Sequence, residues 1–214
     1  MIHTALQDAI ITHVLPPGQR LMEERLAQIF EVSRTPVREA VLRLEAEHFV
    51  QRIPRRGPIV SPITTKDIVD VYVVREATDG LAAYIAAQEA TPADLSKVEW
   101  LNAQFTAQAG MGGEANMGEL VRLNLMFHET LAEISKNALL MSVSKQIHNL
   151  TRRFGSTTFL KPGRAVTAAS EHQQLIEALR VGDGELARDI AVHHMRVARQ
   201  IRIEMLEHEQ ASQE

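Results

Sequence analysis

The chain contains no cysteine, which excludes disulfide bonds, thiolate metal sites and cysteine nucleophiles. Only oxygen and nitrogen ligands therefore remain for any bound metal. No run of about 18 apolar residues occurs, so we expect no segment that spans a membrane. The N-terminal stretch MIHTALQDAIITHVLPPGQ lacks a basic region followed by an apolar one, so we expect no secretory signal. Together these absences predict a cytoplasmic protein.

The net charge of −4 argues weakly against a nucleic-acid partner, but the charges are unevenly distributed. Residues 1–64 hold eight Arg against seven Asp and Glu, whereas the remainder holds fifteen Lys and Arg against twenty acidic residues. Residues 34–56 alone contain six Arg against three Glu. A small basic region on an acidic chain is typical of a DNA-binding domain joined to a domain with another task. The length of 214 residues fits one or two domains.

The first 64 residues have the pattern of a winged helix-turn-helix domain. Helices are predicted over residues 2–13, 23–30 and 34–48, the first two separated by the turn LPPGQRL. Ser33 or Thr35 can cap the third helix, and Pro36 fits its first turn, where the missing N–H costs nothing. The segment FVQRIPRRGPIV places two β-prone runs around Pro54–Gly57, which predicts a hairpin.

Arg34 and Arg38 stand four residues apart at the start of the third helix, so they project on one side of it. The planar guanidinium group can bond guanine O6 and N7 in the major groove, and a helix-turn-helix presents this part of its recognition helix to base edges. Any single arginine could instead be a solvated surface charge, and Arg43 could pair with Glu39 or Glu47. The residues expected from this argument to contact DNA are Ser33, Arg34, Thr35, Arg38, Arg43, Arg55 and Arg56.

Beyond the linker SPITTKD the sequence predicts an all-α helical bundle over residues 65–210, which makes the fold mainly α. Helices are predicted over residues 65–90, 91–109, 119–135, 138–155, 164–181 and 185–207, with a loop at 110–118. The glycines of this loop follow no strand, so we predict no phosphate-binding loop there.

Three of the nine histidines fall on the apolar faces of three different predicted helices: His128, His172 and His194. Asn124 precedes His128 by one helical turn. His148 and His193 have polar neighbours, so both are expected to be exposed. A single inward histidine is more often a hydrogen-bonded core residue, but three of them with an amide oxygen nearby point toward a divalent metal site. The residues alone leave both interpretations open.

Two groups of motifs resemble a known family. The segment from LPPGQ to GPIV, above all VSRTPVREA, resembles the DNA-binding domain of the GntR family of bacterial transcription regulators. The motifs VYVVREATDGLAAYIAA, NLMFHETL and EHQQLIEALRVGDGELAR, with His194, resemble the FCD ligand-binding domain of its FadR-like subfamily. The resemblance covers residues 5 to about 206.

The resemblance implies roles for individual residues. Arg34 and Arg38 would recognise bases, and the Arg56–Gly57 pair would lie at the tip of the wing. The metal ligands would be Asn124, His128, His172 and His194, next to a small carboxylate. Three positions depart from the family pattern. Glu31 and His48 stand where glycine is usual, and Asn124 stands where aspartate is frequent, which lowers the negative charge offered to a metal.

Arg75 lies among apolar residues in the first helix of the bundle and therefore needs a partner. Asp79, four residues further on, could form a salt bridge with it. The family pattern favours instead a contact with the carboxylate of an effector or with that acidic residue near the pocket.

These observations predict a regulator, not an enzyme, whose binding to DNA responds to a small organic acid held near zinc or nickel. Because such DNA sites are usually two-fold symmetric, we expect a homodimer on a palindromic double-stranded operator. One rival is a metalloenzyme, with Glu129 or Glu171 as its base. Others are a sensor for which the metal itself is the signal, and a DNA-binding protein without an effector.

Overall fold

The computed structural model describes residues 1–111, 117–155 and 157–211. These residues form two compact units. The first comprises Met1–Thr64 and Asn149–Gly155, and the second contains the rest of the described chain. The mainly α fold predicted from the sequence is confirmed. The sequence predicts domains at 1–64 and 65–210. That division places the segment 149–155 in the second domain, whereas in the structure it belongs to the first unit.

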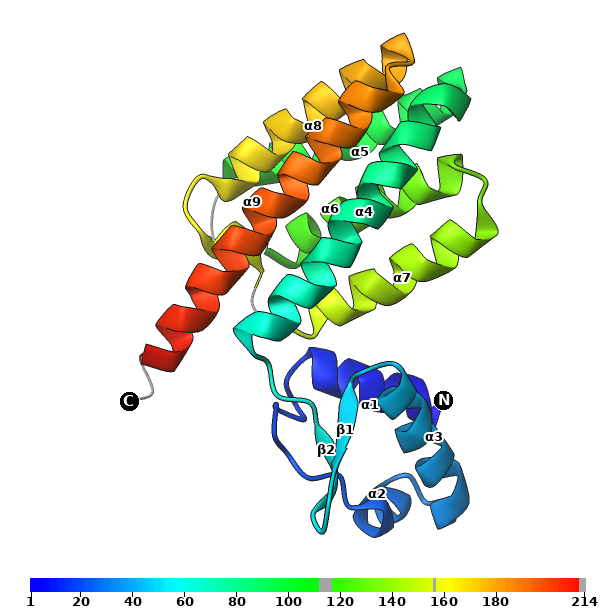
Figure 1. Cartoon of the computed structure of the whole chain (residues 1–214), viewed down its shortest axis with the longest axis vertical. Coiled ribbons are helices and arrows are strands. Elements are labelled where there is room, and N and C mark those ends of the chain that lie inside the picture. The colour runs from blue at the N-terminus through cyan, green and yellow to red at the C-terminus, as the bar shows by residue number, and fades with distance from the viewer. Residues whose placement is uncertain (112–116, 156, 212–214) are drawn as a thin grey trace. The chain divides into compact units, whose positions relative to one another are not determined.

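The first unit contains three helices and a two-stranded sheet: α1 (Ile2–Ile11), α2 (Glu23–Ile29), α3 (Arg34–Ala46), β1 (Val50–Ile53) and β2 (Gly57–Val60) (Figure 1). The strands are antiparallel, with Val50 opposite Val60. Apolar residues from every element are buried together in its core, among them Leu6, Ile10, Leu26, Val37, Val41, Leu44 and Phe49. This is the predicted winged helix-turn-helix, and the hairpin is its wing.

The backbone is left-handed at the two positions where the family usually has glycine. Glu31, after α2, has φ of 53°, and His48, after α3, has φ of 63°. Glycine adopts this conformation without a steric penalty, and it is common just after a helix end. For a residue other than glycine, this left-handed conformation lowers the free energy of unfolding by about 1–3 kcal/mol. The first unit therefore carries local strain at the ends of both helices of its helix-turn-helix motif.

The segment Asn149–Gly155 is bonded to the other residues of the first unit. Arg153 is 4% exposed and donates a hydrogen bond from Nη1 to the carbonyl oxygen of His48 over 2.6 Å. The carbonyl oxygen of Arg153 accepts a hydrogen bond from His13 Nε2 over 3.2 Å. Leu150 packs against the core of the unit. The turn after α3 is thus held by a side chain that lies 105 positions later in the chain.

The second unit is built from α4 (Thr65–Glu89), α5 (Pro92–Met111), α6 (Met117–Ile134), α7 (Ala138–Arg152), α8 (Arg164–Val181) and α9 (Gly184–Ala211), with a short 3-10 helix at Thr158–Leu160. The last turn of α7, from Asn149 on, belongs to the first unit. The bounds predicted for α8 are confirmed. Helices α5 and α6 extend into the predicted loop 110–118, of which residues 112–116 lie outside the described chain. No helix in the described ranges combines the length and the hydropathy that crossing a membrane requires.

Helices α4 and α9 lie side by side along much of their length (Figure 1). The side of α4 that is buried in the bundle is rich in alanine, and α9 also buries alanines: Ala82, Ala83, Ala86 and Ala87 on α4, Ala187 and Ala191 on α9. A Cβ atom on Gly80 would lie only 2.8 Å from Val192 Cγ2 on α9. Gly80 therefore permits a close approach of the two helices. Its neighbour Asp79 and the α9 residue His194 both belong to the site described below.

We expect Gly80→Ala to lower the free energy of unfolding by about 1–2 kcal/mol, because overpacking against Val192 outweighs the better helix propensity of alanine. Gly118→Ala is the matched control, because no atom of the described residues lies within 4 Å of a Cβ atom there. The control should leave stability unchanged or raise it by up to about 1 kcal/mol. Urea denaturation of both variants measures the difference. Equal stability of the two would mean that α9 moves away from α4 at little cost.

Candidate metal centre and DNA interface

Helix α3 turns an apolar side inward and a basic side outward. It buries Val37, Ala40, Val41 and Leu44 and leaves Arg34, Thr35, Arg38 and Arg43 exposed. Ser33 occupies the N-cap position, but its side chain makes no capping hydrogen bond. Its hydroxyl is thus available to an external acceptor such as a DNA phosphate.

The tip of the wing adds two more exposed arginines. Arg55, with φ of 66°, and Arg56 lie between the strands, and Gly57 begins β2 with φ of 80°. Within the described ranges, none of the arginines predicted to contact DNA forms an ion pair. One of the two alternative partners of Arg43, Glu47, bonds His3 and Gln7 instead. The exposed guanidinium groups of α3 and the wing are therefore free to meet phosphates or bases.

A groove of about 570 Å³ borders Arg34 and contains two arginines that the sequence interpretation did not single out. Arg20 and Arg25 both line it and are both exposed. Glu23 and Glu24 also line it, so the groove is not uniformly basic. The basic surface of the first unit is thus wider on the side of α2 than predicted.

In the second unit, His128 of α6, His172 of α8 and His194 of α9 lie together in the interior. One ring nitrogen from each can be chosen so that all three lie within 4.8 Å of one another. The three residues are between 1% and 5% exposed. His193 is exposed on the surface of α9, as predicted from its polar neighbours.

Two of the three histidines lack the hydrogen-bond partners that their burial would normally require. Both ring nitrogens of His128 and of His172 are buried without a partner in the described chain, and so is Oδ1 of Asn124, one turn before His128. A buried polar atom left unsatisfied costs about 1–3 kcal/mol. Burial also holds the pKa of His128 and of His172 well below the usual value, so both rings are neutral. Neutral imidazole nitrogens and an amide oxygen with free lone pairs fit a divalent metal ion.

His172 is oriented by aromatic rings. Its imidazole stacks on Phe127, with ring centroids 4.1 Å apart and planes 17° apart, and the ring of Phe105 lies 5.4 Å away. Stacking covers the face of the imidazole and leaves both nitrogens at its edge uncommitted. The aromatic contacts therefore position His172 without occupying a potential metal ligand.

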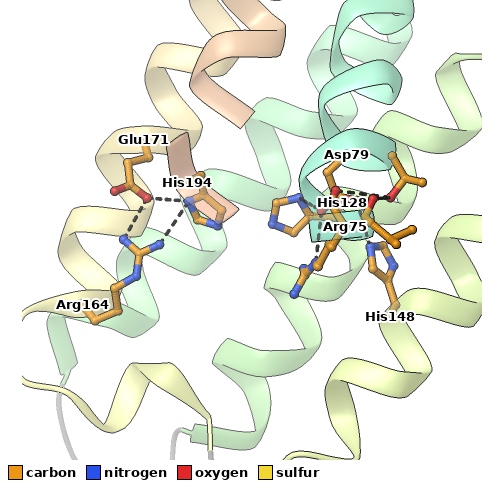
Figure 2. A network of polar contacts seen from close by, with 9 residues as sticks. Arg75, Asp79, His128, His148, Arg164, Glu171 and His194 are labelled. Atoms are coloured by element: carbon orange, nitrogen blue, oxygen red, sulfur yellow. Dashed lines mark hydrogen bonds and ion pairs between the residues drawn. The ribbon is translucent and has the colours of Figure 1, made fainter. Parts of the chain in front are cut away.

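Asp79 joins side chains from three helices beside this cluster (Figure 2). Its Oδ2 accepts a hydrogen bond from Arg75 Nε over 3.2 Å, and its Oδ1 accepts one from His148 Nε2 over 3.4 Å. His128 Nδ1 lies 3.9 Å from Oδ2. Burial alone would raise the pKa of Asp79, but Arg75 and His148 lower it below its usual value, so the carboxylate is ionised. Arg75 thus has the neighbouring partner that the sequence suggested.

The prediction that His148 is exposed is wrong, because its side chain is 3% exposed. Helix α7 buries Leu140, Ser144 and His148, one turn apart from one another, so its inward side is mostly polar. The Oγ atom of Ser144 and Nδ1 of His148 have no hydrogen-bond partner in the described residues. Polar neighbours therefore do not indicate exposure on this helix.

A second group of charged residues, Arg164 and Glu171, flanks His194 (Figure 2). The sequence did not predict their contacts with this histidine. Glu171 Oε2 lies 2.5 Å from His194 Nδ1 and accepts a hydrogen bond from Arg164 Nη1 over 2.8 Å. Arg164 Nη2 lies 3.2 Å from the same His194 nitrogen. Burial raises the pKa of Glu171, but His194 and Arg164 lower it below its usual value. Arg164 and Glu171 are seven residues apart, so they lie on the same side of one helix. This spacing is the feature of the sequence from which their ion pair could have been predicted.

Comparison with known proteins assigns both units. The FCD domain model matches residues 70–197, and the model described as bacterial regulatory proteins, gntR family, matches residues 1–60. This chain belongs to the GntR family and carries an FCD domain. The gntR match contains all of the exposed arginines of α3 and the wing, and the FCD match contains the three histidines and Asn124.

Similar proteins are GntR-type regulators over nearly their whole length. The uncharacterized HTH-type transcriptional regulator YdhC of Bacillus subtilis is 29% identical over 192 residues, which is 90% of this chain and 85% of the relative. The transcriptional repressor RspR of Escherichia coli is 25% identical over 195 residues, 91% of this chain and 84% of the relative. The structure of E. coli McbR/YncC is similar in fold, with a TM-score of 0.75, 21% identity and 96% coverage of both chains. The GntR family and these relatives are transcription regulators and not enzymes.

We expect Asp79→Asn to lower the free energy of unfolding by about 3–5 kcal/mol, because it leaves the charge of Arg75 buried without its counter-charge. Asp70→Asn on the same helix is the control. Asp70 pairs with Lys66, but its side chain is 59% exposed, so its loss should change stability little. Thermal and urea unfolding of both variants test this difference. Equal effects would show that Arg75 finds another partner inside the bundle.

Proposed function

We propose that this GntR regulator changes its affinity for an operator when a small organic acid binds next to a divalent metal in the FCD domain. The metal ligands would be His128, His172, His194 and Asn124. The observation that supports this most is the set of buried imidazoles from three helices, because both nitrogens of His128 and of His172 lack partners in the described chain. Imidazole and oxygen ligands suit zinc and nickel.

The charges around the site favour an anionic effector. The carboxylates of Asp79 and Glu171 are balanced by the guanidinium groups of Arg75 and Arg164. The four candidate ligands are neutral, so a divalent ion would keep its full charge in a buried place. A buried charge needs a counter-charge nearby, and a carboxylate in an open coordination position would supply one. Arg75 is the side chain we expect to contact that carboxylate or to hold Asp79 beside it.

A second candidate function is a metal sensor in which the metal itself is the signal. It is favoured by the nature of the partnerless atoms, because nitrogen and amide oxygen are satisfied by a metal without any organic ligand. Titration of operator binding with Zn²⁺ or Ni²⁺ alone, and then with small organic acids at saturating metal, separates the two functions. Only the first function requires the acid for a change in DNA affinity.

The first unit would bind DNA in the cytoplasm of a bacterium. Arg34 and Arg38 would reach base edges in the major groove, while Arg55 and Arg56 of the wing would contact the backbone or the minor groove. Arg43, Ser33 and Thr35 would contact phosphates, and Gly57 would let the wing approach closely. A homodimer would place two such units on a palindromic operator.

Arg34→Ala and Arg38→Ala should each weaken operator binding by about 1–3 kcal/mol and relax sequence preference, because bidentate base contacts are lost. Arg56→Ala should weaken binding to the operator and binding to non-specific DNA by more nearly equal factors. Fluorescence anisotropy on operator and scrambled duplexes at one salt concentration measures both effects. Unchanged specificity in both α3 variants would remove the base-reading role of this pair.

Full-length His128→Ala, His172→Ala and His194→Ala should each lose most of the Zn²⁺ or Ni²⁺ bound by the wild type, because each removes one ligand of a shared ion. His193→Ala is the matched control on α9, since its side chain is exposed, and it should keep the metal. Elemental analysis after dialysis against each metal gives the stoichiometry. Wild-type protein that stays without metal under these conditions would contradict the metal site and leave a polar effector pocket.

A further inference from the structure

We infer that Glu171 and Asp79 orient His194 and His128 so that both rings present Nε2, and not Nδ1, to the metal. The inference rests on the metal site proposed above and deepens it by naming the ligand atoms and the side chains that select them. Both carboxylates are buried, and each is held in turn by one buried arginine. The two arrangements come from different helices, α8 with α9 and α4 with α6.

The contact at His194 decides its tautomer. Glu171 Oε2 is 2.5 Å from His194 Nδ1, and an ionised carboxylate can only accept a hydrogen bond. His194 Nδ1 must therefore carry the proton, which leaves the lone pair on Nε2. The nearby Arg164 Nη2 cannot donate to a nitrogen that is itself a donor. Its Nη1 bonds Glu171 instead and holds the carboxylate in place.

At His128, too, a carboxylate lies nearer to Nδ1, but the distance is longer. Asp79 Oδ2 lies 3.9 Å from His128 Nδ1, beyond hydrogen-bonding distance, and both nitrogens of the ring are without a partner in the described chain. The negative charge still favours a proton on the nearer nitrogen, and Arg75 and His148 fix the position of the carboxylate. Asp79 should therefore orient His128 in the same way with a smaller effect.

A carboxylate that accepts the second N–H of a metal-bound histidine fixes the ring and raises its basicity. Removal of such a partner typically weakens metal binding by about 10–100-fold. His172 has no carboxylate contact in the described chain, and the ring of Phe127 orients it instead. Carboxylates thus position two of the three histidines and an aromatic ring positions the third, and Glu171 makes the shortest of these contacts.

The first test compares Glu171→Gln with Glu76→Gln in full-length protein. Glu76 also forms ion pairs between α4 and α9, with Arg196 at 3.0 Å and Arg199 at 2.7 Å, but among the described residues it has no hydrogen bond or ion pair with a histidine. The dissociation constant for Zn²⁺, measured by competition with a chelator, should rise about 10–100-fold in Glu171→Gln and stay within about twofold of wild type in Glu76→Gln. Asp79→Asn, measured at a temperature where it is folded, should show a smaller rise than Glu171→Gln.

The second test needs no substitution. Nitrogen-15 NMR of the histidine side chains in the Zn²⁺-loaded wild type distinguishes a metal-bound Nε2 from a metal-bound Nδ1. We expect Nε2 to be bound and Nδ1 protonated in His194 and His128. Zn²⁺ on Nδ1 of His194, or equal affinities of Glu171→Gln and Glu76→Gln, would overturn the inference while leaving the metal site intact. A wild type that binds neither Zn²⁺ nor Ni²⁺ would overturn both. If Glu171→Gln does not fold, the NMR result decides alone.

Discussion

The ion pair between Arg75 and Asp79 is the constraint around which the FCD domain is arranged. Both side chains are almost fully buried, and a buried charge that loses its partner costs several kcal/mol. The helices that supply the neighbours of Asp79 are therefore restricted in how they pack: α6 brings His128, and α7 brings His148. The pair formed by Arg164 and Glu171 imposes a similar restriction on α8 and α9. The histidine centre lies between two fixed carboxylates because the bundle has to satisfy both.

The sequence was informative wherever a helix turns one apolar side inward. His128, His172 and His194 each lie among apolar residues at helical spacing, and that pattern was sufficient to place them in the interior. It failed for His148, because the buried side of α7 is polar and the partner Asp79 is 69 positions away in the chain. It also missed the role of Glu171, which is next to His172 but faces His194 on α9. The burial and the partners of such side chains depend on contacts between helices. The periodicity of apolar residues within one helix carries no information on those contacts.

The winged helix-turn-helix was predictable for a different reason. Its helices and hairpin are specified by short-range signals, namely apolar spacing, the turn residues of LPPGQRL and the run around Pro54–Gly57. Even the departures at Glu31 and His48 were visible as replacements of glycine, and both positions have left-handed backbone. The ends of α5 and α6 were less predictable, because glycine and methionine at residues 110–111 and 117–118 stay helical. Local propensity alone is a weak guide at such helix ends.

The assignment of Asn149–Gly155 to the DNA-binding unit bears on how this protein could be recombined with its relatives. The unit is not one continuous piece of chain, because Arg153 and Leu150 complete it from far downstream. A chimaera joined at residue 64 would pair the winged helix with a foreign version of this segment. The carbonyl of His48 would then depend on whatever side chain the donor supplies. Exchange of DNA specificity between such regulators is therefore simpler through the exposed residues of α3 and the wing than through the whole domain.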